Sequence, residues 1–392
     1  MSLRRIAELR KGRRTECVAQ LARDQRSRFT IPYQTNPARK IGVRVHDERK
    51  AFDTKGTIMN IKWHDIKKST LNVHEKNGVV WLSFPNLDRE DWLNAVFSTR
   101  IGGVSRGPLA SMNFSFTQEL LMNAESGPYA PETLPTRNEC RAITNGCIIE
   151  NASLSDADVR HALTDEDAWK NSSFANVLEN FRLFADAAGF RAEDIVCSDQ
   201  THTTNVLRVG RSDSGSGITR PLDWLDVDGF ITDEPGVVLS TFYADCVPLY
   251  FADPVHHAIG LSHSGWKGTS MQMGRVTVEA MKREFGSDPR DMLAAIGPSI
   301  SGAHYEVSWD VARHFDPEFR PLEYPDRGLP AEEEKYMLDL WGVNRKILMD
   351  AGIPEENIQL PNLCTFENAD IMFSHRASHG KRGNLGAFIS IR

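Results

Sequence analysis

The chain has 392 residues, of which 40% are hydrophobic and 25% are charged. This length suits one large domain of about 250–300 residues with appendages better than two equal domains. The longest apolar runs, such as residues 247–252, are far too short to span a bilayer, so we expect no contact with a membrane. The six cysteines form no CxxC pair, which argues against a disulfide framework and favours reduced thiols in a cytoplasmic protein.

The formal net charge of −7 hides a basic N-terminal segment. Residues 1–70 hold 18 Lys and Arg against 7 Asp and Glu, a net charge of +11, so the rest of the chain sums to −18. Weak periodicity and many arginines predict that residues 1–58 form a disordered basic extension. Such an arm suits non-specific contact with nucleic acid or anionic surfaces and no more. Two other interpretations are an organelle-targeting peptide and translation that begins at Met59.

Ordered structure is predicted to begin near Gly78. Strands are predicted over 78–85 and 95–100, and the second leads into the glycine-bearing turn IGGVSRGP. Residues 117–172 are rich in Asn, Glu, Ser and Asp and are interrupted by three prolines, which is typical of an insertion. Apolar residues at helical spacing then predict a helix over 176–190, with Gly189 suited to its C-terminal cap.

The second half of the chain alternates between short apolar segments and turns. DGFIT, GVVLSTFYA, VPLYFAD and HAIGLSHSG predict successive buried strands, and MLAAIGP and the terminal LGAFISI predict two more. Helices are predicted over 269–286, 308–315 and 337–351, the first ending at Gly286.

Three candidate metal ligands stand where predicted strands meet turns rich in small residues. They are His202 in SDQTH, Cys246 in YADCVP and His263 in LSHSGW. Two imidazoles and one thiolate form a suitable donor set for Zn²⁺, and three protein ligands leave the fourth position for water or substrate. The intervals of 44 and 17 residues match no compact metal motif, so spacing alone leaves a structural role in the core open for each residue.

Seven blocks between residues 98 and 376, taken in order, resemble one known family. They are STRIGGVSRGPLASMNFSF (98–116), DQTH (199–202), DVDGFITDEPGVVLSTFYADCVPLYFADP (226–254), HSGWKGT (263–269), AIGPSISGAHYEV (295–307), LDL (338–340) and NLCTFENADIMFSHR (362–376). The chain thereby resembles the YfiH family, also called laccase-domain or multicopper-polyphenol-oxidase-like protein and, more recently, purine nucleoside phosphorylase. The ADC and HSGWKG blocks are the most specific.

The resemblance implies an α/β (α+β) fold of layered mixed β-sheets flanked by helices. It implies a single catalytic domain over residues 77–392, with the insertion at about 117–172. It also implies that His202, Cys246 and His263 bind one zinc ion, with copper as the less favoured metal. The implied activity is phosphorolysis of adenosine, inosine and guanosine to base and ribose 1-phosphate, with adenosine deamination and methylthioadenosine cleavage as side activities. Purine nucleosides and phosphate are therefore the expected partners.

Phosphorolysis needs cationic or backbone donors that hold phosphate against the ribose C1′. Arg100 is a candidate because Gly102 and Gly103 beside it allow close approach of the backbone to an anion. Arg376 and Lys267 are further candidates, although a surface role is open for each.

Four polar residues have both a functional and a structural interpretation. Asn113 and Gln200 suit hydrogen bonds to ribose or base, and turn roles suit them equally. Asp245, beside Cys246, suits a proton shuttle for deamination, as does Asp228, and each also suits the fixing of a loop. We expect Cys364 to be structural or to support the metal ligands from behind.

The sequence departs from the family pattern at two cationic positions. Lys267 replaces the arginine of the family's HAGWRG motif, which keeps the charge and loses the bidentate fork. Near the C-terminus, residues 381–384 read KRGN where the family reads KTGR. Both departures concern the phosphate contacts and not the metal ligands.

Three other functions remain open from the sequence. A cysteine hydrolase would use Cys246 as its nucleophile with a nearby histidine as base. A copper polyphenol oxidase is less favoured, because the 12 histidines include no HxH pair. A non-enzymatic regulator, or a peptidoglycan-editing factor, would use the basic arm or the insertion to bind a partner.

Overall fold

The computed structural model describes residues 69–119, 174–325 and 327–392, which belong to one compact unit, Ile61–Arg392. The predicted basic extension (1–58) and residues 120–172 of the predicted insertion lie outside the described residues. None of the helices in the described ranges has the length and apolar character that a bilayer span requires.

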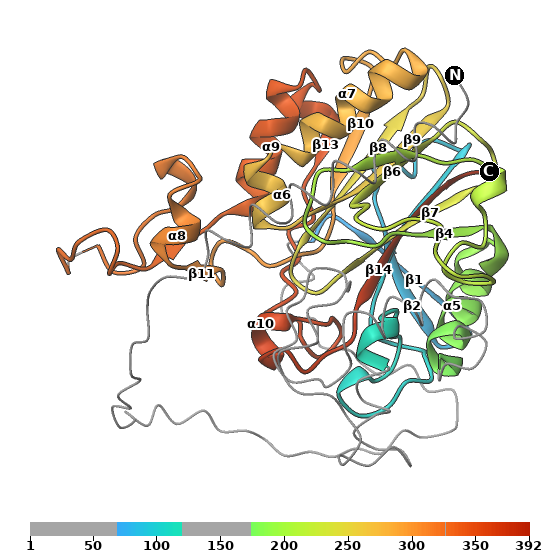
Figure 1. Ribbon diagram of the computed structural model, residues 1–392, viewed down its shortest axis with the longest axis horizontal. Coiled ribbons are helices and arrows are strands. Elements are labelled where there is room, and N and C mark those ends of the chain that lie inside the picture. The colour runs from blue at the N-terminus through green and yellow to red at the C-terminus, as the bar shows by residue number, and fades with distance from the viewer. Residues whose placement is uncertain (1–68, 120–173, 326) are drawn as a thin grey trace, which may run out of the picture. The chain divides into compact units, whose positions relative to one another are not determined.

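Two six-stranded mixed sheets form the centre of this unit (Figure 1). The strands of the first sheet, in spatial order, are β1 (Asn72–Lys76), β2 (Val79–Ser83), β3 (Leu93–Ser98), β14 (Leu385–Ile391), β7 (Val238–Tyr243) and β4 (Ile195–Cys197). Neighbours are antiparallel except for the parallel pair β7 and β4.

The second sheet has the same number of strands. In spatial order they are β13 (Ile358–Gln359), β10 (Leu293–Ile296), β8 (Val247–Asp253), β9 (Ala258–Ser264), β6 (Gly229–Thr232) and β5 (Val206–Arg208). The pairs β13–β10 and β6–β5 are parallel and the other neighbours are antiparallel. A separate two-stranded sheet pairs β11 (Glu306–Val307) with β12 (Tyr336–Met337).

Side chains alternate between the two faces of each strand, and both faces of the central strands are buried. Along β14, Leu385, Ala387 and Ile389 enter the core between the two sheets, while Phe388 enters the core on the outer face of the first sheet. Along β8, Tyr250 faces the inner core and Phe251 the outer core of the second sheet. The strands therefore appear in the sequence as continuous apolar runs.

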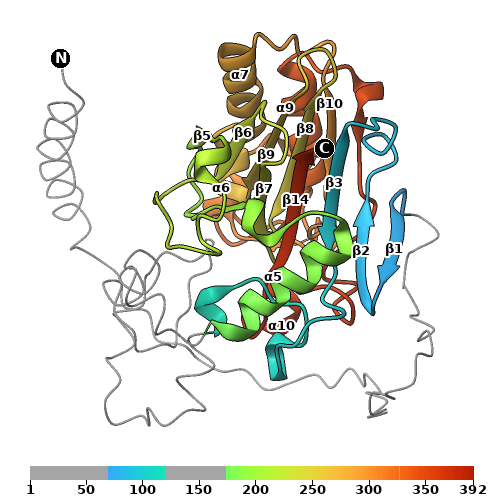
Figure 2. The ribbon, with the colours of Figure 1, turned by 90° about the vertical axis from the view of Figure 1, so that its right-hand side faces the viewer.

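Helices cover the two outer faces (Figures 1 and 2). On the outer face of the first sheet, α5 (Ala175–Ala188) packs through Phe181 and Phe184. On the outer face of the second sheet lie α7 (Met273–Phe285) and α9 (Leu340–Asp350). The short helices are α6 (Trp266–Ser270), α8 (Trp309–Ala312) and α10 (His375–Ser378), with 3₁₀ turns η1 (Gly107–Leu109), η3 (Ala192–Asp194), η4 (Arg211–Asp213), η5 (Pro317–Phe319) and η6 (Glu355–Asn357). This architecture confirms the predicted class of layered mixed sheets flanked by helices.

The pairing directions bring several loops to one edge of the two sheets. Since β14 is antiparallel to both β3 and β7, and β4 is parallel to β7, the strands β3, β4 and β7 all end at the same edge of the first sheet. In the second sheet, β9 and β10 end where β6 and β8 begin. The turn 244–246 joins β7 directly to β8, so the loops of both sheets meet there.

Three details differ from the sequence prediction. Strand β1 lies before the predicted start of order and pairs with β2. The helix predicted over 269–286 is two helices, because Gln272 adopts a left-handed backbone (φ 61°) between α6 and α7. The helix predicted over 337–351 begins at Leu340, because Tyr336–Met337 pairs as a strand and the Asp339 side chain caps the helix.

Candidate functional site

Three segments at the shared edge bring His202, Cys246 and His263 together. His202 lies in the loop after β4, Cys246 in the turn between β7 and β8, and His263 near the end of β9. The pairing of β8 with β9 sets His263 opposite Pro248, two residues beyond Cys246. Strand register therefore determines the proximity of two of the three residues, and the loop after β4 adds the third.

The three side chains are close enough to hold one metal ion. His202 Nε2 lies 3.7 Å from Cys246 Sγ, and the centroids of the His202 and His263 rings are 4.9 Å apart. One ligand atom from each residue lies within 4.8 Å of the other two. Tetrahedral zinc, with bonds of about 2.0–2.1 Å to nitrogen and about 2.3 Å to sulfur, places those two atoms about 3.6 Å apart. The donor set and its spacing fit such an ion.

Gly265 leaves the space that two of these ligands occupy. A Cβ at this position would lie 2.6 Å from His202 Cδ2 and 3.0 Å from Cys246 Sγ. Any larger residue would displace a ligand or the backbone, since a buried interior has no spare volume. The glycine of HSGW is therefore needed for packing of the site, a role that the sequence analysis did not assign.

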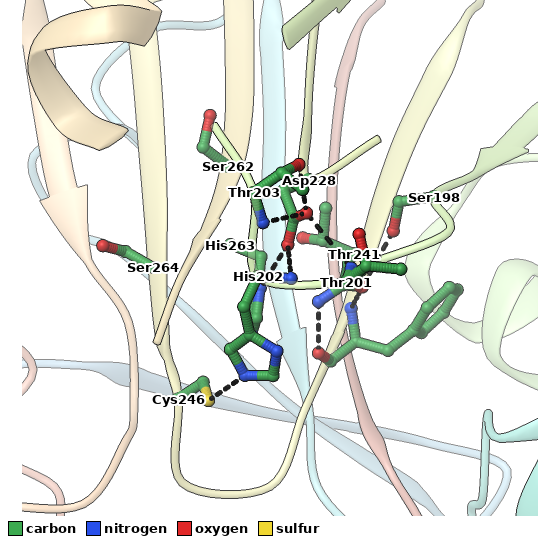
Figure 3. A network of polar contacts seen from close by, with 12 residues as sticks. Ser198, Thr201, His202, Thr203, Asp228, Thr241, Cys246, Ser262, His263 and Ser264 are labelled. Atoms are coloured by element: carbon green, nitrogen blue, oxygen red, sulfur yellow. Dashed lines mark hydrogen bonds and ion pairs between the residues drawn. The ribbon is translucent and has the colours of Figure 1, made fainter. Parts of the chain in front are cut away.

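Asp228, directly before β6, holds both histidines in place (Figure 3). Its buried carboxylate accepts a hydrogen bond from His263 Nδ1 at 2.8 Å. It also accepts hydrogen bonds from four donors of the loop after β4, namely the backbone N–H groups of Thr201, His202 and Thr203 and the Thr203 hydroxyl. Bonded in this way, His263 Nδ1 is a donor, which leaves Nε2 free to bind a metal.

The ionised form of Asp228 is the one that these contacts favour. Burial by itself raises the pKa of the carboxyl group, but the hydrogen bonds from His263 and Thr203 and the charge of His263 bring it below its ordinary value. Asp228 is thus a positioning residue, and its donors leave it poorly suited to the proton shuttle that the sequence allowed.

The surroundings keep His202 and Cys246 uncharged. Burial lowers the pKa of His202, and the neighbouring His263 adds to this effect. Burial raises the pKa of the Cys246 thiol to about 12, and the charge of Asp245 adds to this effect. A nucleophilic cysteine needs the opposite pair of shifts, with a thiolate beside an imidazolium. These shifts disfavour a thiolate nucleophile in the absence of a metal. A neutral imidazole is the form that binds a metal, and the Cys246 thiol gives up its proton when it binds one.

Left-handed backbone conformations frame the site. His202 has φ 62°, Asp226 has φ 60° and Asp245 has φ 94°, although none of them is glycine. Such conformations are uncommon for residues with a Cβ, and they concentrate at functional sites. The chain holds these loops in place with side-chain hydrogen bonds rather than with regular structure.

Gln200 and Asn113, predicted to contact ribose or base, bond within the protein instead. Gln200 accepts from the backbone N–H of Phe242 at 2.7 Å and donates to its carbonyl at 2.8 Å. Asn113 Oδ1 accepts from the backbone N–H groups of Ser115 and Asn384. Both side chains have no exposed surface. These contacts fit the structural alternative that the sequence left open: Gln200 ties the His202 loop to β7, and Asn113 joins two chain segments.

Arg100 also has internal partners. Its guanidinium donates to the carbonyls of Ala110 at 2.7 Å and Ala369 at 2.9 Å and stacks on the Phe373 ring. Burial lowers its pKa, although nearby Asp370 opposes that effect. The structure therefore shows Arg100 joining two loops, and its predicted phosphate contact stays a prediction.

Gly102 and Gly103 are required by packing rather than by an anion. A Cβ on Gly102 would lie 2.4 Å from the carbonyl oxygen of Gly78, and the residue has φ 95°. A Cβ on Gly103 would lie 2.2 Å from the carbonyl oxygen of Ser111. The close backbone approach expected from the sequence is present, but the backbone approached is the chain's own.

Asp245 connects the Cys246 turn to two later segments. One carboxylate oxygen accepts a hydrogen bond from the Thr365 hydroxyl at 2.7 Å, and the other accepts from the backbone N–H of Arg376 at 2.7 Å. Because both oxygens have protein donors, Asp245 fixes these loops, and its predicted proton-shuttle role has no support in the geometry.

Arg376 and Lys267 are the predicted cations that remain near the metal ligands. The Arg376 guanidinium donates to the carbonyl of Glu306 at 2.9 Å and lies over the Tyr305 ring. Lys267 is exposed on α6, and its charge contributes to the lowered pKa of His202, after burial and His263. Both cations therefore belong to segments that adjoin the candidate metal ligands.

The sequence analysis did not single out Tyr305 or His375. Burial raises the pKa of Tyr305, the charge of Cys246 raises it further and that of Arg376 lowers it, and the Arg376 guanidinium lies over the Tyr305 ring. His375, next to Arg376, has a buried Nδ1 without a hydrogen-bond partner among the described residues. Their signal in the sequence was only their position inside the blocks AHYEV and FSHR.

Comparison with known proteins identifies the family of the chain. The family described as multi-copper polyphenol oxidoreductase laccase matches residues 166–392. The chain is 38% identical over 222 residues to purine nucleoside phosphorylase YlmD of Bacillus subtilis (strain 168), an alignment that spans 56% of this chain and 78% of that protein. It is 35% identical over 217 residues to the purine nucleoside phosphorylase of Bacteroides thetaiotaomicron, with coverage of 55% and 80%.

Solved structures show the same architecture. The crystal structure of YlmD from Geobacillus stearothermophilus superposes with a TM-score of 0.60 at 28% sequence identity and covers 83% of this chain and 99% of that one. The hypothetical protein YfiH of Bacillus licheniformis superposes with a TM-score of 0.58 at 28% identity, with coverage of 82% and 99%.

Proposed function

The chain belongs to the multi-copper polyphenol oxidoreductase laccase family, the YfiH family, and from this membership we propose that it is a zinc-dependent purine nucleoside phosphorylase. In the proposed reaction the bond between the base and the ribose C1′ of adenosine, inosine or guanosine breaks. A phosphate oxygen bonds to C1′, and the base leaves as its neutral, protonated form together with ribose 1-phosphate. Adenosine deamination and methylthioadenosine cleavage are proposed as side activities of the same site.

The observation on which this proposal rests is the donor set of His202, Cys246 and His263 with Asp228 behind it. The set has one soft and two borderline ligands, and its spacing fits zinc. A zinc ion held there would supply Lewis-acid chemistry. The absence of HxH pairs in the sequence disfavours multicopper oxidation, despite the description of the family.

The chain's own residues position the metal ligands and bind phosphate in the proposed reaction. Asp228 orients His263 and the His202 loop through its hydrogen bonds. Asp245 holds the Cys246 turn against the segment of Arg376. In the part of the chain that the structure describes, the Arg376 guanidinium makes one hydrogen bond, so donors remain for a phosphate oxygen. This placement supports phosphate binding on the Arg376 side of the metal ligands.

Phosphate dependence tests the proposed reaction. Purified zinc-loaded full-length protein is incubated with adenosine, with and without phosphate, and the products are separated by chromatography. We expect adenine and ribose 1-phosphate in equal amounts with phosphate present, and no base release without it. Inosine and guanosine should behave alike. Base release that is independent of phosphate, or no release from zinc-loaded protein, would overturn the proposal.

The phosphate contact is tested with Arg376→Ala. We expect the KM for phosphate to rise about tenfold or more, about 1.4 kcal/mol, while the KM for the nucleoside changes little. The KM for phosphate of Arg376→Lys should fall between those of Arg376→Ala and the wild type, because lysine keeps the charge and loses the planar fork. Arg345→Ala, which removes an exposed arginine paired with Glu355, is the control. An unchanged KM for phosphate in Arg376→Ala would assign the phosphate contact to another residue.

A further inference from the structure

A second group of potential metal ligands lies outside the site described above. His304 follows β10 in the loop before β11, and Cys364 and Glu367 lie in the segment after β13. One ligand atom from each of the three lies within 4.8 Å of the other two. The two segments are held together by a bridge between Ser299 and Cys364. From the sequence, Cys364 was expected to be structural or to support the metal ligands, and not to bind a metal itself.

The distances within this group match metal coordination. His304 Nδ1 lies 3.8 Å from Cys364 Sγ and 3.5 Å from Glu367 Oε1. Tetrahedral zinc with nitrogen, sulfur and oxygen ligands places its donors about 3.4–3.6 Å apart. These separations are long for ordinary hydrogen bonds involving nitrogen and oxygen, and they suit ligands around a common ion.

One nitrogen stands opposite three polar groups. His304 Nδ1 also lies 3.3 Å from the Ser301 hydroxyl, besides the thiol of Cys364 and the carboxylate of Glu367. A single ring nitrogen offers one hydrogen or one lone pair, so it satisfies one of these partners at a time. A cation bound by His304 Nδ1, Cys364 Sγ and the Glu367 carboxylate would satisfy these three ligand groups together.

The chain positions the three ligands with further contacts. The Phe366 ring stacks on His304 at a centroid distance of 4.7 Å and fixes the plane of the imidazole. The backbone N–H of Ser301 donates to Cys364 Sγ at 3.3 Å, the kind of hydrogen bond that stabilises a ligating thiolate. A turn closed by the Asn368 N–H on the Cys364 carbonyl brings Cys364 and Glu367 to one side of the segment.

The charge and exposure of these ligands favour a divalent cation that keeps one coordination position open to water. A thiolate and a carboxylate together neutralise a doubly charged ion, which lowers the cost of holding it near a buried sulfur. Cys364 is buried, while the side chains of His304 and Glu367 are 28% and 33% exposed. Solvent therefore reaches the ligands from one side, and water can complete the coordination.

We propose that His304, Cys364 and Glu367 form a second metal site, which binds Zn²⁺ independently of His202, Cys246 and His263. The two groups of ligands are neighbours. Thr365, beside Cys364, donates to Asp245, beside Cys246, at 2.7 Å. A metal at the second site would thus hold in place the segment that anchors the Cys246 turn.

Metal content tests the proposal with zinc alone as the probe. Full-length protein is stripped with chelator, loaded with Zn²⁺, passed through a desalting column and analysed for zinc per chain. We expect about two ions in the wild type, about one in Cys246→Ala, about one in Cys364→Ser and none in the double variant. His256→Ala, which removes a half-exposed histidine paired with Asp253, is the control and should keep both ions.

Cobalt spectra provide a second readout that does not depend on activity. Cys246→Ala loaded with Co²⁺ should keep a near-ultraviolet sulfur-to-cobalt band from Cys364, and adding Cys364→Ser should remove it. Glu367→Gln should keep the band and weaken Co²⁺ binding about 10–100-fold, because it replaces a charged ligand with a neutral one. Glu306→Gln, at a nearby exposed carboxylate paired with Lys335, should change neither.

The possible outcomes separate this proposal from the proposed function. If Cys246→Ala binds no metal and the wild type binds one ion, the second site does not exist and the first remains. If the wild type and Cys246→Ala both bind one ion that Cys364→Ser loses, the second site stands and the first fails. A Glu367→Gln affinity equal to that of Glu306→Gln would remove Glu367 from the ligand set and overturn the site as proposed.

Discussion

Replacement of Cys246 by alanine should abolish phosphorolysis of adenosine while the protein remains folded. Cys246 is the only thiolate among the three ligands of the first site, so Cys246→Ala leaves two imidazoles, which cannot hold the ion firmly. We expect kcat/KM to fall by about 10³-fold or more, a loss of about 4 kcal/mol of transition-state stabilisation. Steady-state rates of base release, measured beside zinc content on the same sample, check this.

A second buried cysteine provides the control for that variant. Cys197 ends β4 and lies 3.6 Å from the Ser240 hydroxyl, away from the metal ligands. Cys197→Ala should keep its zinc and its activity and should lose about 1 kcal/mol of stability through the smaller side chain. Equal activity of Cys246→Ala and the wild type would show that the site does not perform the chemistry.

Replacement of Asp228 by alanine should weaken both the fold and the metal site. Asp228→Ala leaves His263 Nδ1 and the backbone donors of the loop after β4 without their acceptor, all of them near the buried edge of the sheets. We expect a loss of about 3–5 kcal/mol in the free energy of unfolding, as when one partner of a buried pair is removed. The remaining folded protein should bind zinc about 10–100-fold more weakly, because His263 loses the group that orients it.

Denaturant titration and competition with a zinc chelator measure the two effects separately. Asp228→Asn keeps the side-chain shape and one acceptor oxygen. Its free energy of unfolding and its zinc affinity should therefore both fall between those of Asp228→Ala and the wild type. Asp233→Asn removes an exposed aspartate paired with Arg208 after β6, and it should change stability by less than about 1 kcal/mol. The role assigned to Asp228 is wrong if zinc affinity is the same in Asp228→Ala and Asp233→Asn.

Local patterns in the sequence were sufficient for the long buried strands and most helices, but not for the short strands β4, β5, β11, β12 and β13. Burial on both faces gives β7, β8, β9 and β14 continuous apolar runs, which are visible without knowledge of their neighbours. Gly189 and Gly286 end α5 and α7 in left-handed conformations, as glycine after a periodic segment predicts. Strand β1 was missed because its residues alternate weakly and are mostly exposed.

The assignment of polar residues within the site depended on contacts that no local pattern contains. His202, Cys246 and His263 meet because strand order and register bring three distant segments to one edge. Whether Gln200 faces substrate or a backbone amide is decided by β7, 42 residues later in the chain. The role of Arg100 similarly depends on a carbonyl 269 residues away in the chain. Side chains that suit both roles can be assigned only once their partners are known.

The position of β14 has a consequence for how the polypeptide matures. This strand follows every other strand in sequence, yet it lies between β3 and β7 and pairs with both. Before residues 385–391 leave the ribosome, the first sheet exists as two separate halves with unpaired inner edges. The exposed inner edges of β3 and β7 are both covered by β14, so the first sheet is complete only once this strand is in place.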